Sequence, residues 1–258
     1  MACSSASAPM YKALFELSAD RADFVSRLFT KPRPAGLSAT SSARDIMTAY
    51  WTVRTDSESV YRANLAAIQR VLLENRRLPL SPQDLAGIEY VYSRFYWHGP
   101  AMTWATTSGR VLGVSRLPTF GDLMLQTDAK GRELSFLGSE AAFAVVKGLQ
   151  EKNLIVPVVG NFAGSKAIRA VGDYIRGQRA TVSAFYVSEV EPYLVGKGQW
   201  STFCSNVATL PVTDTSVLIR PPTVSLEGTG MILAQAPSPA PPILVPIAAA
   251  VKNCTLPR

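Results

Sequence analysis

The spacing of apolar side chains in the first half of the chain predicts helices. Between residues 10 and 29 the apolar positions recur at helical intervals and divide near Ser18, which predicts two short amphipathic helices. Similar patterns continue as far as residue 117, so we expect residues 10–117 to be mainly helical.

Two longer helices carry start signals. Thr55 and Glu58 have the spacing of a capping box, in which a hydroxyl and a carboxylate reciprocally satisfy unpaired backbone amides. Ser81, Pro82 and Asp84 supply a cap, a first-turn proline and an acid that the helix dipole favours. We therefore expect a helix to begin at each of these points.

Residues 118–220 are expected to form strand–helix repeats. Leu154–Val159, with the sequence LIVPVV, is a continuous apolar run typical of a strand covered on both faces, although its proline removes one hydrogen-bond donor. A helix is expected over Ser165–Arg176 and a second strand over Thr181–Val187. Strand–helix–strand units of this length nearly always form right-handed parallel crossovers.

The same alternation continues with a helix over Trp200–Leu210 and a strand over Ser216–Arg220. It predicts an α/β fold in three layers. We expect a single domain over residues 10–220. Residues 1–9 and the proline-rich stretch 221–258 are expected to be disordered or loosely attached tails, because such a composition buries little apolar surface.

Composition gives only a weak indication of nucleic-acid binding. The 258 residues are 47% hydrophobic and 17% charged, which is ordinary globular composition, and their formal net charge of +7 is dispersed without a block of five or six like charges. An aromatic cluster has the period of a helix packed on a core, although such side chains also stack on bases; it comprises Tyr90, Tyr92, Phe95, Tyr96, Trp97 and Trp104.

The cysteines and the histidine exclude several kinds of site. Cys3, Cys204 and Cys254 are odd in number and lack metal-ligand spacing, so a disulfide framework is not expected and Cys204 is interpreted as a buried, inert thiol. His98 is the only histidine, which excludes a site with several histidine ligands within one chain. We expect no metal site.

The chain shows no segment for export or membrane insertion. The first nine residues lack the basic start and apolar core of a secretory signal. The longest apolar run, residues 243–251, is interrupted by Pro246 and is shorter than the roughly 20 residues that cross a bilayer. These features predict a cytoplasmic protein without a membrane partner.

Candidate ligand-binding residues follow the two predicted strands, because open parallel sheets bind ligands beyond the carboxyl ends of their strands. The first loop offers glycines for close approach and an amide side chain, and the second offers a hydroxyl and a carboxylate; together they contain Gly160, Asn161, Phe162, Gly164, Ser188 and Glu189. Two alternatives stay open. The glycines also suit plain turns or close helix packing, and Glu189 and Glu191 also suit the first turn of a helix.

Residues 153–194, NLIVPVVGNFAGSKAIRAVGDYIRGQRATVSAFYVSEVEPYL, together with SFLGSEAAFAVVKGLQEK before them, resemble a family of uncharacterised bacterial proteins. That family is placed in the S-adenosylmethionine-dependent methyltransferase superfamily. The resemblance extends over about residues 10–220. It implies a Rossmann-like, methyltransferase-like three-layer sandwich that binds S-adenosylmethionine through the two loops.

The resemblance also implies that part of the domain is missing. Members of the family carry a glycine-rich strand–loop before the position of Met10, so this chain is expected to begin inside its domain. Within the shared part, Asn161, Ser165 and Glu189 stand where the family commonly has aspartate, proline and asparagine. Loss of the aspartate removes a carboxylate that accepts ligand hydrogen bonds.

Two functions therefore follow as hypotheses. The chain is a methyltransferase-like protein of unknown substrate, truncated or inactive, with a small-molecule ligand. Alternatively it is a non-enzymatic interaction or scaffold domain that associates with itself through an incomplete sheet. The sequence does not decide whether the protein is an enzyme.

Overall fold

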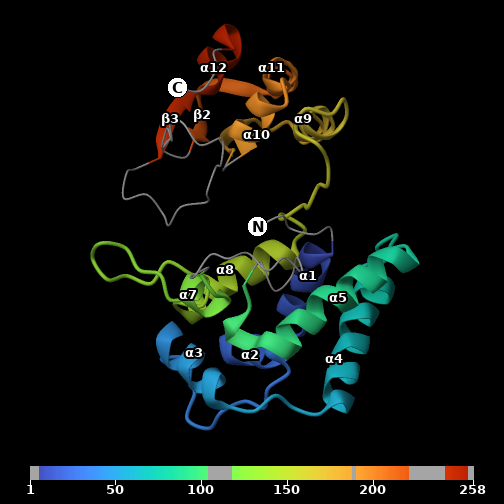
Figure 1. Cartoon of the computed structure of the whole chain (residues 1–258), viewed down its shortest axis with the longest axis vertical. Coiled ribbons are helices and arrows are strands. Elements are labelled where there is room, and N and C mark those ends of the chain that lie inside the picture. Colours follow the sequence, from blue (N-terminus) through green and yellow to red (C-terminus); the bar gives the residue numbers. More distant parts are fainter. Residues whose placement is uncertain (1–5, 104–117, 188–189, 221–241, 255–258) are drawn as a thin grey trace. The chain divides into compact units, whose positions relative to one another are not determined.

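The computed structural model describes residues 6–103, 118–187, 190–220 and 242–254 (Figure 1). Contacts divide the chain into two compact units, Met1–Pro157 and Val158–Arg258. We call them the N-terminal unit and the C-terminal unit. The single domain expected over residues 10–220 is thus shared between two units.

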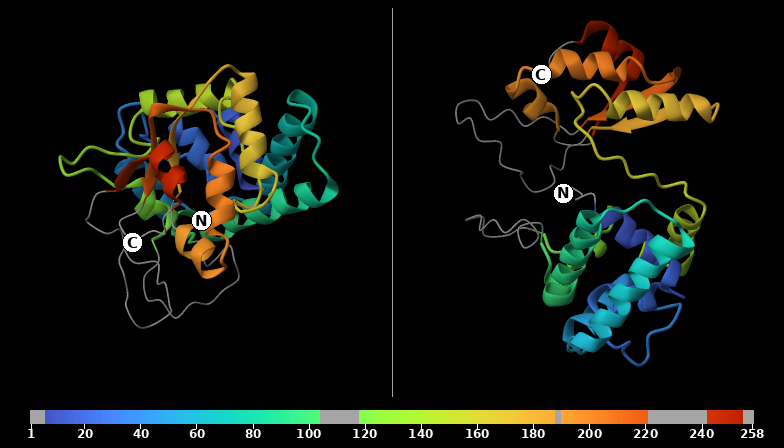
Figure 2. Two further views of the ribbon diagram at one scale, coloured as in Figure 1. Left: turned by 90° about the horizontal axis from the view of Figure 1, so that it is seen from above. Right: turned by 90° about the vertical axis from the view of Figure 1, so that its right-hand side faces the viewer.

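The N-terminal unit is built from helices. α4 continues directly into the π-helical turn η1, and α4 and α5 lie against each other (Figures 1 and 2). The helices are α1 (Ser7–Leu17), α2 (Arg21–Phe29), α3 (Ala43–Thr52), α4 (Glu58–Arg70), η1 (Val71–Asn75), α5 (Pro82–His98), η2 (Gly99–Ala101), α7 (Phe120–Met124) and α8 (Glu140–Glu151).

Short local signals start several of these helices. Ser81 caps α5, as predicted, and it also forms a capping box with Asp84 that was not predicted. The prediction of a capping box at Thr55 and Glu58 was wrong. α4 begins at Glu58 after Ser57, whose side chain makes no capping hydrogen bond. Further capping boxes, which the sequence analysis did not identify, start α3 and α7.

The core of the N-terminal unit contains a group of packed aromatic rings. Phe24 is fully buried, and its ring centroid lies 4.7 Å from that of Phe15 and 5.7 Å from that of Phe143. Tyr92 is also fully buried, and its hydroxyl lies 2.9 Å from the hydroxyl of Thr30. Phe95 is likewise buried, which supports the core interpretation of these two members of the aromatic cluster. Trp104 lies outside the described residues.

A buried arginine joins the N-terminal unit's helices and loops. Arg21 is 1% exposed, and its Nε donates to Glu140 Oε1 at 2.9 Å. The other guanidinium nitrogens donate to backbone carbonyls of Leu137, Ala39 and Ser41. Because the charge is both paired and hydrogen-bonded, it is tolerated in the core.

The described part of the C-terminal unit combines a three-stranded sheet with four helices. The strands are β1 (Val182–Tyr186), β2 (Val212–Arg220) and β3 (Ile243–Pro246), in the order β1-β2-β3. β1 and β2 are parallel, and β3 is antiparallel to β2. The helices are α9 (Ala167–Gly177), α10 (Val190–Gly196), α11 (Trp200–Val207) and α12 (Ile247–Asn253) (Figures 1 and 2).

This architecture corrects the fold class predicted from the sequence. About 55% of the described residues are helical, and the sheet has three strands of mixed direction. A Rossmann-like three-layer sandwich needs a larger, mainly parallel sheet with helices on both faces, so that prediction was wrong. β1 falls within the predicted strand Thr181–Val187, whereas β2 begins at Val212, before the predicted strand Ser216–Arg220. The two strands are parallel neighbours, and the chain between them forms α10 and α11.

The predicted strand Leu154–Val159 does not form. In this stretch the chain is in neither a helix nor a strand. An apolar, β-branched composition favours a strand only when a neighbouring strand pairs with it. Among the described residues, none pairs with this run.

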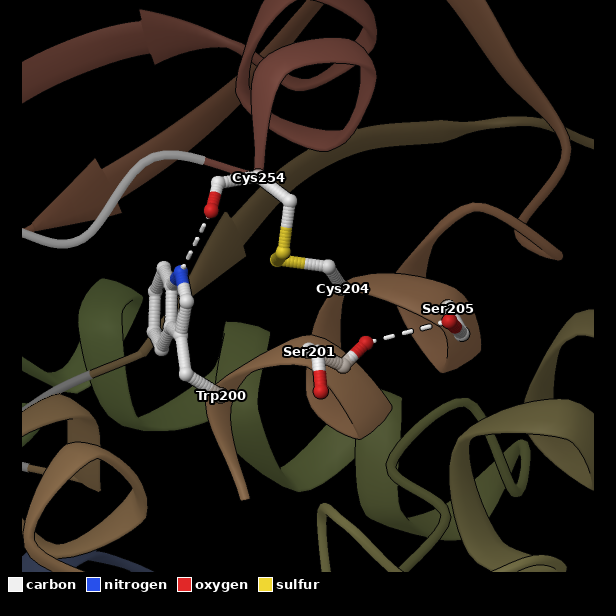
Figure 3. Close-up of a disulfide and its surroundings, with 5 residues drawn as sticks. All are labelled: Trp200, Ser201, Cys204, Ser205 and Cys254. Atoms are coloured by element: carbon white, nitrogen blue, oxygen red, sulfur yellow. Dashed lines mark hydrogen bonds between the residues drawn. A yellow bond between two sulfur atoms is a disulfide. The ribbon is translucent and has the colours of Figure 1, made fainter. Parts of the chain in front are cut away.

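A disulfide between Cys204 and Cys254 joins α11 to the residue after α12 (Figure 3). Beside it, Trp200 Nε1 donates to the backbone oxygen of Cys254 at 3.2 Å. The interpretation of Cys204 as a free thiol was therefore wrong. β3 and α12 lie within the stretch that we expected to be loosely attached, and Ile247 is 1% exposed.

Candidate functional site

The parallel pair β1–β2 defines the carboxyl edge of the sheet. Beyond β1, the Val187 N–H donates to the Ile219 carbonyl in β2 at 3.1 Å. β2 ends at Arg220, and α10 begins at Val190. The ends of these two strands are therefore adjacent, which is where ligands bind in open parallel sheets.

A buried ion pair occupies this edge. Glu191, in the first turn of α10, is 2% exposed. Arg220 Nε lies 2.9 Å from its Oε1 and 3.0 Å from its Oε2. Only the contact with Oε2 has the geometry of a hydrogen bond, so Oε1 lacks a hydrogen-bond partner among the described residues.

The surroundings of Glu191 raise the pKa of its carboxyl group. Burial is the main cause, because removal from water disfavours the charged form. The hydrogen bond and the positive charge of Arg220 act in the opposite direction and only partly offset the effect. This carboxylate is already engaged by a neighbouring cation.

The predicted ligand loop, residues 160–164, is closed by its own hydrogen bonds. Asn161 Oδ1 accepts from the Ala163 N–H at 2.9 Å, which is an Asx turn. The Gly164 N–H donates to the Asn161 carbonyl, also at 2.9 Å. The amide side chain that we expected to bind a ligand thus accepts a hydrogen bond within its own loop.

Asn206, on α11, holds the same loop from the other side. Its Nδ2 donates to the Phe162 carbonyl at 2.9 Å and to the Gly164 carbonyl at 2.8 Å. Its Oδ1 accepts from Arg169 Nε at 2.9 Å. Asn206 is 1% exposed, and these bonds satisfy a polar group that would be costly to bury unpaired.

The other two loop residues also have packing partners. A Cβ at Gly160 would overlap with the Cβ of Ala167, so glycine allows the loop to approach the start of α9. Phe162 packs against Phe185 of β1 and Phe203 of α11, with ring centroids 6.0 Å and 6.3 Å apart. Ser188 and Glu189 lie outside the described residues.

A family match covers this region. Residues 102–233 match a family described as "Domain of unknown function (DUF7790)". The chain belongs to this family. The DUF7790 match includes the closed loop and the Glu191–Arg220 pair, and it ends before β3 and α12. No curated protein matches the chain.

The rest of the described DUF7790 chain contains a hollow but no cluster of metal-ligating side chains. A hollow of about 410 Å³ lies in the N-terminal unit, and Ala6, Gly87 and Tyr90 are among the residues that line it. Within the described ranges, no group of three or more histidine, cysteine or acidic side chains is placed to hold a metal ion. Nor does any described helix have the length and apolar character needed to cross a membrane.

The sequence analysis missed Asn206 and Arg220. Asn206 appeared only as a residue within the helix expected over Trp200–Leu210, and its partners lie between 37 and 44 residues earlier in the chain. Arg220 appeared only as the end of a strand. A buried polar residue is recognised from its partners, and the sequence does not show them.

Proposed function

We propose that the chain is a non-enzymatic interaction domain. The observation that supports this most directly is the closed loop at residues 160–164. Its amide oxygen, three of its carbonyl groups and its first glycine make contacts within the C-terminal unit: these are Asn161 Oδ1, the carbonyls of Asn161, Phe162 and Gly164, and Gly160. A ligand at this loop would have to displace these contacts.

The ion pair at the carboxyl edge supports the same proposal. Ribose hydroxyls and amines bind to carboxylates that are accessible to them. Glu191 is buried and faces Arg220, so a ligand would have to separate a charged pair, which is costly in a low-dielectric site. Neither of these two features offers a preformed binding site.

The methyltransferase-like alternative rests on the resemblance of residues 153–194 and on the parallel pair β1–β2, which has an acid at its carboxyl edge. In this alternative, S-adenosylmethionine binds beside the loop at residues 160–164. Asn161 would then have to give up its hydrogen bond to Ala163. The two proposals therefore predict different affinities of the chain for S-adenosylmethionine.

Calorimetric titration separates the two. We expect no saturable heat when the full chain is titrated with S-adenosylmethionine up to millimolar concentration. Asn161→Asp is a matched variant that restores a carboxylate and keeps the side-chain oxygen that accepts from Ala163. Saturable binding by the unmodified chain would contradict the interaction proposal and favour the methyltransferase-like one, whereas binding by the variant alone would identify Asn161 as the cause of the loss.

Light scattering tests the interaction proposal directly. An interaction domain with an open sheet edge is expected to associate with itself as its concentration rises. A weight-average mass that stays at the monomer value over the whole accessible concentration range would count against it.

A further inference from the structure

The edge of β2 that faces away from β1 is covered by β3, a strand of four residues. β3 pairs antiparallel with Val217–Arg220, the carboxyl half of β2, and three of its four residues are exposed to solvent. The DUF7790 match ends at residue 233, so β2 lies inside the family pattern and β3 lies outside it. This second edge of β2 is therefore occupied by a segment beyond the matched residues.

Backbone directions show how β2 receives this strand. The Ile219 carbonyl accepts from the Val187 N–H, so it points to β1. Because backbone groups alternate in direction along a strand, those of Leu218 point to β3 and face its register partner Val245. The next residue, Pro246, stands where an N–H would point away from β2, which is where a strand tolerates proline.

The side chains of β3 define the chemistry of an occupant that fits this edge. Val245 lies opposite Leu218, a buried core residue. Ile243 and Leu244 are 45% and 61% exposed, and no residue of β3 is charged. The edge thus accepts a short, extended, aliphatic segment that runs antiparallel to β2.

Besides the disulfide, only short elements attach this part of the chain. α12 has seven residues, fewer than an isolated helix needs to be stable in water. Its Ile247 is buried, and Ala250 and Val251 are partly buried. The Cys204–Cys254 bond ties the residue after α12 to α11, so the bond supplies a large part of the attachment.

The disulfide is accessible from the side of Cys254. Cys204 is 6% exposed, whereas Cys254 is partly exposed. A dithiol that attacks there opens the bond in two exchange steps. Two electrons and two protons pass to the protein, both cysteines become thiols, and the dithiol becomes a disulfide.

We propose that the second edge of β2 is a strand-binding site that the disulfide regulates. While the Cys204–Cys254 bond is closed, β3 occupies the edge as the chain's own ligand. After reduction β3 and α12 detach, and an extended aliphatic segment of a partner protein takes the place of β3 by strand addition. The inference deepens the proposed interaction function, rests on it and adds its regulation.

A peptide with the sequence of β3 tests this site. Fluorescence polarisation of labelled PILVPIA, residues 242–248, measures its affinity for the full chain before and after treatment with dithiothreitol. The reduced chain should bind it about 30-fold or more tightly, because a cross-link of this size strengthens the competing β3 by at least that factor. Cys254→Ser should bind like the reduced chain under both conditions, and Cys3→Ser should respond to reduction as the unmodified chain does.

Two matched variants separate the site from competition by β3. Val245→Pro removes the N–H that faces Leu218, whereas Leu244→Pro removes one that points away from β2. After reduction, Val245→Pro should bind the peptide most tightly, and Leu244→Pro should bind it as the unmodified chain does. In the peptide itself, N-methylation of the valine should abolish binding and N-methylation of the leucine should not.

The outcomes also separate this inference from the proposed function. Equal peptide affinity before and after reduction contradicts the regulation, and equal effects of the two N-methyl groups contradict the register. If reduced Val245→Pro binds no peptide while light scattering still shows self-association of the unmodified chain, the strand site is contradicted and the interaction function survives. A chain that neither binds the peptide after reduction nor associates with itself contradicts both proposals.

Discussion

Glu191 is an ionisable side chain almost wholly removed from solvent, and burial raises its pKa above the ordinary value. An acid whose pKa is higher in the folded state binds its proton more tightly there. Its contribution to stability is therefore fully present below the ordinary pKa of about 4.3 and is lost as the pH rises through the raised value. The charge of Arg220 moderates this loss.

Replacing Glu191 by glutamine should reduce this pH dependence. The glutamine side chain cannot ionise, yet its oxygen can still accept from Arg220. We expect the free energy of unfolding of the C-terminal unit to fall less with rising pH in Glu191→Gln than in the unmodified chain. Urea titration at several pH values measures this free energy. The signal is the fluorescence of Trp200 in a chain whose other three tryptophans are replaced by phenylalanine. Glu151→Gln, at an exposed position, is the control, and equal pH slopes in all three chains would contradict the assignment.

The surroundings of two glycines predict opposite effects on stability when each is replaced by alanine. Gly148 lies within α8 with no atom within 4 Å of an added Cβ, so Gly148→Ala should stabilise the N-terminal unit by about 0.5–1 kcal/mol. Gly160→Ala would force a Cβ against Ala167 and should destabilise the C-terminal unit by about 1–3 kcal/mol. Urea titrations of both variants check the signs, and a stabilising Gly160→Ala would show that the loop is free to move.

The sequence identified Gly160 as important but did not show why. A glycine after an apolar run suits both ligand approach and close packing, and only the position of Ala167 favours the second. Asn161 was likewise recognised as a hydrogen-bonding residue. Its partner Ala163 lies in the same turn, which a sequence pattern does not distinguish from a ligand.

Among the helices and strands, the sequence predicted best those features that depend on local signals, such as helix starts. The helix start at Ser81 follows from capping within one turn, and it forms as expected. The strand over Leu154–Val159 failed because a strand needs a partner that its own residues do not specify. β3 and α12 were missed because their attachment depends on contacts with distant residues, including Cys204.

The disulfide is expected to hold α12 and β3 on the C-terminal unit. It closes a loop with a sequence separation of 50 residues, and a cross-link of this size contributes about 2–4 kcal/mol by restricting the unfolded chain. Reduction, or Cys254→Ser, should therefore speed hydrogen exchange in residues 243–253. Exchange in α1 and α2 should stay unchanged.

Hydrogen exchange read by mass spectrometry, with and without a dithiol reductant, measures this effect. Cys3→Ser is the matched control, because it removes a cysteine that is outside the described disulfide. Equal protection of residues 243–253 before and after reduction would show that packing alone holds them. Disulfides persist mainly in oxidising compartments. The Cys204–Cys254 bond is therefore not expected in the cytoplasmic location that the sequence predicts.

At the scale of the whole molecule, the boundary between the two units falls within the exposed apolar run, at Pro157 and Val158. The DUF7790 match extends across this boundary, from residue 102 to residue 233. The family pattern therefore includes the run together with elements of both units. This is consistent with a role for the run beyond simple connection.

The run should be a preferred cleavage site for a protease. A protease that cuts beside large aliphatic residues needs an accessible, unpaired backbone, which residues 155–159 provide in the single chain. Dilute protein should thus be cut within Leu154–Val159, leaving fragments that correspond to the two units. Mass spectrometry of the fragments locates the cut, and a first cut within a helix of either unit would contradict the accessibility of this run.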